Sequence, residues 1–302
     1  PSSNRGLRIP VDDDRDGLFD EDGPDDLDGD GSITNMRIRD TLGRLKSDPH
    51  DPRLMISVRP GEKGEWTRLG QEGIDNDGDG LVNEDSEGFV DGNRNWGMNW
   101  KPPYVQRGAG NYPFEGTGIK AIAGWMLARP NIILVFAFHN NGGMYLRGPS
   151  FKAAGELPQG DIQVYDYLGQ NMEKIVPGYE YLISWKDLYA TYGDFTDFTN
   201  NLIGSYSLVG ELYQPETETY DGTMARKSEE RSRFGEASEG ERQRLLFDDN
   251  VNQGELFKEW KPYKHPLYGD VEIGGWTKMS SRLPHPFMLQ DLVHRKIGRA
   301  HV

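Results

Sequence analysis

The spacing of hydrophobic residues divides the chain into two parts. Residues 10–92 are rich in Asp and Gly, and their apolar positions show little periodicity, which predicts loops. After residue 110, apolar residues recur at intervals typical of helices and strands. A helix is predicted over 117–129, with one apolar face formed by Ile119, Ile122, Ala123 and Met126.

Further elements follow in alternation. The apolar run 131–140 (NIILVFAFHN) predicts a strand buried on both faces, as in a parallel sheet. A second amphipathic helix is expected over 161–176, a strand over 205–213 and a charged helix over 226–247, while 265–276 reads as a hairpin. This order predicts an α/β fold, a single domain over 1–302 with a mixed, mostly parallel central sheet flanked by helices.

Composition excludes several classes of protein. The net charge is −15, which disfavours partners that are nucleic acids or anionic membranes. The chain has no cysteine, so it has neither disulfides nor zinc sites made of thiolates. No apolar run reaches the ~18 residues of a membrane span.

The Asp-rich part contains a repeated pattern, DxDxDG. Two long copies share the spacing of 12-DDDRDGLFDED-22 and 75-DNDGDGLVNED-85, and a shorter copy covers 26–31. Alternate carboxylates in a tight loop can converge on one calcium ion, and the Gly permits the turn. The expected ligands are Asp12, Asp14, Asp16, Asp26, Asp28, Asp30, Asp75, Asp77 and Asp79.

These loops are not EF-hands, because Gly23 and Ser86 stand at the twelfth position, where a bidentate Glu belongs. They are similar to short calcium repeats of extracellular bacterial proteins, which favours a secreted or periplasmic protein. We therefore interpret residues 10–86 as a calcium-loop insertion. The alternative is an acidic loop that is merely solvated.

Three later features carry candidate chemistry: 90-VDGNRNW-96, His139 at the end of an apolar strand, and Glu211 at the end of SYSLVGELY. Each has an ordinary explanation on its own. An Arg in a loop is usually an ion-pair partner, a His at a strand end is usually structural, and a Glu there is usually solvated.

Together and in this order, the three features resemble the zinc carboxypeptidase family, the carboxypeptidase A-like metallopeptidases. The family's motifs correspond here to DGNRNW, VFAFHNN, Tyr189 and VGELY, and the resemblance covers about residues 85–213. The segment 188–212 resembles the family's Tyr-to-Glu segment without a gap, with Asp197-Phe198 and Tyr206-Ser207 at matching positions. The resemblance implies a carboxypeptidase-like fold.

The resemblance also implies a role for each site residue. Arg94, with Asn93 beside it, would bind the terminal carboxylate of the substrate, and Thr196 would line the pocket for the terminal side chain. His139 would be a zinc ligand, Glu211 the general base, and Tyr189 would close over the substrate. Arg37 is the candidate for stabilising the oxyanion, with Arg39 as the alternative.

One part of the family pattern is missing. The family supplies two zinc ligands from an upstream HxxE motif, and no Glu stands three residues after any histidine of this chain. We expect the missing pair to lie before Pro1; the alternative is a degenerate homologue that never bound zinc. At the other end, IGRAHV (297–302) is expected to be a sequencing-adapter artefact.

The expected function is zinc-dependent removal of C-terminal residues from peptides or proteins that have a free C-terminus. Without the HxxE ligands, the chain as given is expected to be inactive. Two alternatives stay open: a calcium-binding extracellular adhesion module, and an inactive carboxypeptidase-like peptide binder.

Overall fold

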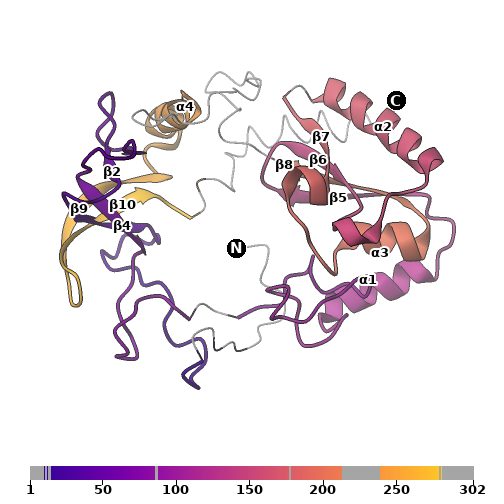
Figure 1. The fold of residues 1–302 in the computed structure, drawn as a ribbon, viewed down its shortest axis with the longest axis horizontal. Helices are drawn as coiled ribbons and strands as arrows, with labels where there is room; N and C mark the ends of the chain where they lie inside the picture. Colours follow the sequence, from indigo (N-terminus) through magenta and orange to yellow (C-terminus); the bar gives the residue numbers. More distant parts are fainter. Residues whose placement is uncertain are drawn as a thin grey trace. The chain divides into compact units, whose positions relative to one another are not determined.

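The computed structural model describes residues 10, 12, 15–85, 88–176, 178–212, 239–278 and 280. Contacts divide the chain into two compact units, drawn as ribbons in Figure 1. The α/β unit contains Glu87–Leu212, and the β unit contains Asp13–Ser86 with Tyr213–Asp291. Whether the two form one domain, as the sequence predicts, stays a prediction.

The α/β unit is built on a four-stranded sheet in the order β5-β8-β6-β7. The strands are β5 (Leu134–Asn140), β8 (Tyr206–Leu212), β6 (Met144–Arg147) and β7 (Glu180–Ile183). The pairs β5–β8 and β6–β7 are parallel, and only β6–β8 is antiparallel. The predicted α/β class, with a mixed and mostly parallel sheet, is confirmed.

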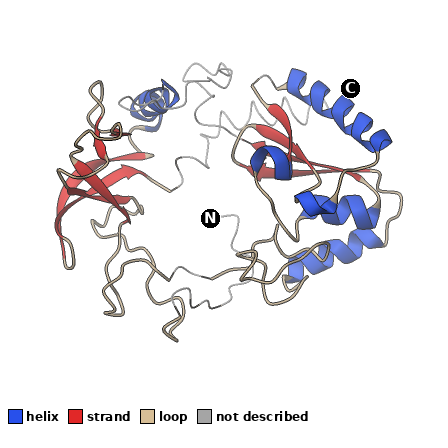
Figure 2. Cartoon of the chain, viewed as in Figure 1, coloured by secondary structure: helices blue, strands red, loops and turns tan. Residues whose placement is uncertain are grey.

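Helices cover this sheet. Figure 2 draws α2 on one side of the strands and α1 with α3 on the other. The helical segments are α1 (Thr117–Leu127), η1 (Lys152–Ala154), α2 (Gln159–Ile175), η2 (Ser184–Leu188), α3 (Phe195–Phe198) and η3 (Thr199–Ile203). No helix within the described ranges is both long and apolar enough to cross a bilayer.

Side-chain packing explains how α2 lies against the sheet. Tyr165 is buried, and its hydroxyl accepts a hydrogen bond of 2.8 Å from the backbone N–H of Ser207 in β8. One turn further on, a Cβ at Gly169 would lie 2.2 Å from the ring of Tyr181 in β7. Only glycine permits this close approach of helix and strand.

The predicted helices over 117–129 and 161–176 and the strand over 205–213 are confirmed as α1, α2 and β8. The expectation that 131–140 is buried on both faces is wrong. Among the residues that the structure describes, β5 pairs with β8 alone, and Leu134 and Phe138 are 51% and 48% exposed. Leu134 and Phe138 lie four residues apart and so point to the same face of the strand, which the described segments leave partly uncovered.

The β unit is an antiparallel sheet of six strands in the order β3-β2-β4-β1-β10-β9. Its elements are β1 (Asn35–Arg39), β2 (Leu45–Ser47), β3 (Met55–Ser57), β4 (Trp66–Gln71), α4 (Glu239–Phe247), η4 (Asp248–Asn252), β9 (Phe257–His265) and β10 (Gly269–Trp276). The predicted hairpin over 265–276 is confirmed for its turn and its second strand, β10, while its first strand, β9, begins earlier, at Phe257. The charged helix is confirmed over 239–247, and 226–238 lies outside the described residues.

The prediction of loops throughout 10–92 is wrong for residues 35–71, which form β1 to β4. These strands are only three to six residues long, and β1 pairs with β10, more than 200 residues away. Their core cluster combines Leu54 and Ile56 with Leu245 and Phe257 from the far end of the chain. Short strands with distant partners leave little local periodicity to detect.

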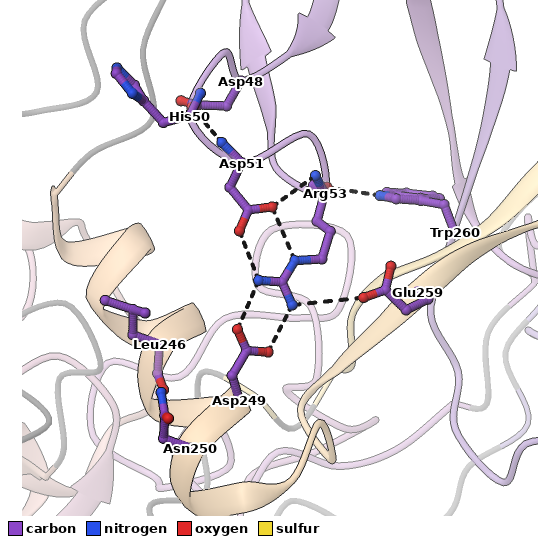
Figure 3. A network of polar contacts seen from close by, with 9 residues as sticks. All are labelled: Asp48, His50, Asp51, Arg53, Leu246, Asp249, Asn250, Glu259 and Trp260. Carbon is purple, nitrogen blue, oxygen red and sulfur yellow. Dashed lines mark hydrogen bonds and ion pairs between the residues drawn. The ribbon is translucent and has the colours of Figure 1, made fainter.

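A network around Arg53 joins separate segments of the β unit (Figure 3). Its guanidinium donates to Asp51 at 3.0 and 2.7 Å and to Asp249 in η4 at 2.7 and 2.8 Å. Glu259 in β9 lies 3.7 Å away, and the carbonyl of Arg53 accepts a hydrogen bond from the Trp260 indole. These carboxylates raise the pKa of Arg53 above its ordinary value.

Replacing Arg53 by Ala should lower the free energy of unfolding by about 2 kcal/mol, because two bidentate charge-assisted pairs are lost together. Chemical denaturation followed by far-UV circular dichroism measures the change. The charge-matched control is Lys264→Ala, which removes an exposed ion pair with Asp270 and should change stability by less than about 0.5 kcal/mol. Equal effects of both substitutions would contradict the network's role.

Candidate active site

The register of β5 against β8 places His139 directly opposite Glu211. Their side chains approach to 3.6 Å between Nδ1 and Oε1, with 28% and 16% of the two side chains exposed. Both residues lie near the carboxyl ends of adjacent parallel strands, which is where ligands commonly bind in α/β sheets. The sequence prediction named both residues, and the structure brings them together.

The backbone of Glu211 is held from both sides of its strand. It pairs with His139 of β5 on one side and with Met144 of β6 on the other. Its carbonyl also accepts a hydrogen bond of 3.0 Å from the N–H of Gly143, the residue directly before β6. A carboxylate that is carried by a backbone held in this way, and is still partly open to solvent, can take or return a proton.

The DGNRNW loop uses Asn95 and Trp96 for its own structure. Asn95 is fully buried; its amide donates to the carbonyls of Ala109 and Tyr112 at 2.7 and 2.8 Å, and its Oδ1 accepts from Gly116 N–H at 3.0 Å. Trp96 is 5% exposed and belongs to a core cluster with Ala123 and Phe198. Asn95 is thus a structural residue that the sequence reading did not single out.

Asn93 ties this loop to the segment that precedes α3. Its Oδ1 accepts a hydrogen bond of 2.9 Å from Phe195 N–H, and Trp96 N–H donates to Gly193 O at 2.9 Å. Gly193 has φ +66°, and a Cβ there would lie 2.4 Å from Arg94 O, so the two segments pack backbone to backbone. The residues predicted to bind substrate, Asn93, Arg94 and Thr196, therefore lie on joined segments.

Arg94 differs from its neighbours because its side chain is hardly used. Its Nη1 donates to Asn93 O at 2.8 Å, and no ion pair joins it to a carboxylate in the described part of the chain. The side chain is half-buried. A guanidinium with open donors is suited to bind a carboxylate in bidentate fashion. No direct contact joins Arg94 to His139 or Glu211 within the described residues.

Thr196 is buried in α3 and belongs to a polar network. Its Oγ1 donates to Asp194 Oδ1 at 2.6 Å and lies 3.3 Å from Ser150 Oγ. Asp197 beside it is 2% exposed and accepts a hydrogen bond from Ser150 N–H at 3.2 Å. Burial, with the nearby Asp194 carboxylate, raises the pKa of Asp197 to about 6.

Tyr189 is 55% exposed, and its N–H donates to Ser184 O at 3.0 Å. Arg37 lies in the β unit, where its Nε and Nη2 donate to Glu272 Oε2 at 2.8 and 2.6 Å. Its guanidinium also stacks between Trp66 and Trp260, with centroid distances of 3.9 and 4.0 Å. These contacts favour a packing role, and its assignment to the oxyanion stays a prediction, as does that of Arg39, which stacks on Trp66.

The described residues do not complete a zinc site around His139. A catalytic zinc ion takes three protein ligands. None of the groups of three convergent metal-ligating side chains in the described part includes a histidine. His265 is unsuited to the role, because Nδ1 accepts from Leu267 and Tyr268 N–H and Nε2 donates to Gly73 O.

The acidic loops share one local geometry. The first Asp of the loop accepts a hydrogen bond from the Gly five residues on, in Asp75–Gly80 at 3.0 Å and in Asp26–Gly31 at 2.8 Å. The third Asp of each loop accepts from the N–H two residues on, as seen at Asp16, Asp30 and Asp79. The repeated spacing in the sequence therefore corresponds to a repeated structure.

Oxygen atoms of Asp75, Asp77 and Asp79 lie within 4.8 Å of one another, as the sequence predicts for a cation site. Asp26 and Asp28 converge with Glu72, a buried residue that the sequence reading missed. Asp16 converges with Glu21 and Asp77, while Asp12 and Asp30 belong to none of these groups. Asp14 lies outside the described residues. That any of these groups binds calcium stays a prediction.

Comparisons with known proteins add little. No protein-family model matches the chain, and no curated protein sequence matches it. A carboxypeptidase A from Helicoverpa armigera is similar in structure, with 23% identity, a TM-score of 0.34, and coverage of 40% of this chain and 32% of that one. The chain thus spans about a third of that structure, and at this TM-score the likeness carries no weight for function.

The raised pKa of Asp197 predicts a pH dependence of stability. The folded protein holds this proton more tightly than the unfolded chain, so its contribution is present below the unfolded pKa and is lost as the pH rises through about 6. A rise from 3.8 to about 6 corresponds to at most about 3 kcal/mol. Asp197→Asn should therefore flatten the decrease in Tm between pH 4 and pH 7.

The control is Asp187→Asn, an exposed aspartate in the same unit, which should leave the pH profile unchanged. If Asp197→Asn leaves the profile as steep as in the unmodified protein, Asp197 is ionised in the folded state and the inference is wrong.

Proposed function

We propose that this chain carries the substrate-binding and proton-transferring residues of a metallocarboxypeptidase, which releases C-terminal residues from peptides or proteins. The observation that supports this most is the β5–β8 register, which sets His139 against Glu211 in the same compact unit as the DGNRNW loop. The DGNRNW loop, His139 and Glu211 follow one another along the chain in the same order as the motifs of the zinc carboxypeptidase family that they resemble.

In this proposal, Arg94 binds the free carboxylate of the substrate's last residue. The contacts of its loop support the assignment. Asn93 and Asn95 hydrogen-bond to other segments, and Trp96 packs in the core. The Arg94 guanidinium is therefore the group of this loop that is left to bind a ligand. A planar guanidinium binds a carboxylate through two parallel hydrogen bonds. Recognition of a chain end requires such a counter-charge.

Glu211 is the proposed general base. It would accept a proton from the attacking water and return it to the amine that leaves when the peptide bond breaks. His139 is the proposed zinc ligand, and the ion would need two more ligands than the described residues provide around it. We therefore propose hydrolysis only for a form of the protein in which those ligands are present.

The incomplete ligand set favours a second candidate, an inactive carboxypeptidase-like domain that binds peptide C-termini. This candidate would use Arg94 in the same way and would not need Glu211. In either case we propose that the acidic loops bind calcium and stabilise the β unit, which suits a secreted or periplasmic protein in contact with external calcium.

Binding of short peptides tests the role of Arg94. A peptide with a free C-terminus should bind at least tenfold more tightly than its C-terminal amide, because the amide leaves the guanidinium without its charged partner. Arg94→Ala should abolish this difference. The control is Arg129→Ala, in which the lost guanidinium stacks on the exposed Trp125. Isothermal titration calorimetry measures both peptides against all three proteins, and equal affinity of the two peptides for the unmodified protein would refute the assignment.

Turnover separates the two candidates. In zinc-loaded protein that cleaves peptides, Glu211→Gln should reduce kcat by at least a thousandfold while leaving peptide affinity and zinc content unchanged. The enzyme should have a higher kcat/KM for peptides that end in a neutral residue than for peptides that end in Lys or Arg, because Thr196 offers no charge to pair with those side chains. Peptide binding without turnover in the unmodified, zinc-loaded protein would favour the peptide-binding domain instead.

A further inference from the structure

Two acidic residues follow each of the long DxDxDG loops at the same offset. Glu21 and Asp22 follow the first loop, and Glu84 and Asp85 follow the loop that begins at Asp75. Asp22 and Asp85 are fully buried, and Glu21 and Glu84 are partly buried. Buried carboxylates are unusual because desolvation penalises their charge, so each needs a compensating partner.

The four residues meet across the two loops in a reciprocal arrangement. Glu21 faces Asp85, and Glu84 faces Asp22, so each loop presents its Glu to the Asp of the other. Burial is the main cause that raises the pKa of Glu21, and burial with the Asp22 carboxyl raises that of Glu84 to about 7. The protein thus places four carboxyl groups together in a site largely shielded from water.

Hydrogen bonds compensate for this arrangement only in part. Within the described part of the chain, Glu21 Oε2, Asp22 Oδ2 and Glu84 Oε2 are buried and accept no hydrogen bond. None of these three side chains forms an ion pair with a described Lys or Arg. The other oxygen of Asp22 accepts a single hydrogen bond of 3.3 Å, from Asn76. The charge can be balanced by a bound cation or by a proton shared between carboxyl groups.

The carboxylates also converge in space. Oxygen atoms of Asp22, Asp77 and Glu84 lie within 4.8 Å of one another, and those of Asp16, Glu21 and Asp77 form a second such group. A calcium ion binds oxygen at about 2.3–2.6 Å, so ligands on opposite sides of one ion lie up to about 5 Å apart. The donor set is all oxygen and anionic, which selects a hard divalent cation.

We propose that Asp22, Asp77 and Glu84 bind a divalent cation of the calcium class between the first and third acidic loops. This ion is additional to the ion that the third loop would hold through Asp75, Asp77 and Asp79, and Asp77 bridges the two. Its role is to clamp the two loops together. The inference extends the proposed calcium binding from single loops to a site that exists only when both loops are in place.

The competing explanation is that Asp22 and Glu84 share a proton instead of a cation, and the sign of a stability change distinguishes the two. Asp22→Asn and Glu84→Gln keep the side-chain size and remove one charge. In millimolar calcium, each should lower Tm, because a ligand is lost. In excess EDTA, each should raise Tm, because repulsion is relieved. An increase in Tm under both conditions would overturn the proposal.

Counting bound calcium shows whether the site is separate from the loop. Asp79→Asn removes a ligand of the third loop alone, and Glu84→Gln removes a ligand of the clamp alone. Each should lose one calcium ion by equilibrium dialysis with mass spectrometry of the metal, and the double variant should lose two. Loss of only one ion in the double variant would show that Glu84 serves the loop's own ion.

The charge-matched control is Asp270→Asn, which changes an exposed residue of the β9–β10 hairpin. This substitution should leave the number of bound calcium ions unchanged, and its effect on Tm should have the same sign in calcium and in EDTA. If the unmodified protein binds no divalent cation, both the clamp and the proposed loop sites fail. If it binds calcium and Glu84→Gln leaves the count unchanged, only the clamp fails. Neither result affects peptide recognition by Arg94, which is measured separately.

Discussion

The features of the α/β unit that bear on function depend on the register in which β8 pairs with β5. Successive side chains of a strand point to opposite faces of the sheet, so a slip of one residue would separate His139 from Glu211. Ser207, fully buried at the start of β8, fixes the register: its N–H donates to the Tyr165 hydroxyl, and its Oγ accepts from Thr199 at 2.7 Å. Two helical segments thereby lock the strand that carries the proposed base.

The β unit faces a different constraint, the placement of many carboxylates close together. Some of these carboxylates form ion pairs with basic side chains: Asp51 and Asp249 pair with Arg53, and Asp28 pairs with Lys261. Glu72 is instead satisfied by the N–H and hydroxyl of Thr34 and by Leu27 N–H. Asp22 Oδ2 and Glu84 Oε2, between the first and third loops, are buried and accept no hydrogen bond from the described residues, and for this reason we propose a cation as their partner.

Local patterns in the sequence predicted four elements of the α/β unit, α1, β5, α2 and β8, and missed β6, β7 and α3. The helical face of 117–129 and the apolar strand 205–213 depend on residues close in the chain, and both form as expected. The strands β1 to β4 could not be predicted in this way, because β1 requires β10 as a neighbour and Arg37 on β1 is buried between two Trp rings. A buried arginine within a five-residue strand disguises the hydrophobic pattern.

The sequence predicted which chemical groups the candidate site contains. It could not predict which of these residues hold the structure and which are left to bind a ligand. The motif DGNRNW indicated polar recognition, yet only the fold shows that Asn95 holds residues 109–116 in place while Arg94 remains open. Similarly, the repeated Glu-Asp after two acidic loops was a visible signal in the sequence. Its meaning appears only when the two loops lie against each other.

A crystal structure of this protein with a short peptide bound through its free C-terminus tests the central claim most directly. The account predicts both carboxylate oxygens about 2.8 Å from the Arg94 guanidinium. It also predicts that the last peptide bond lies next to His139 and Glu211, at the carboxyl ends of β5 and β8. A peptide whose carboxylate binds to another cation, with the Arg94 fork turned to solvent, would contradict the account.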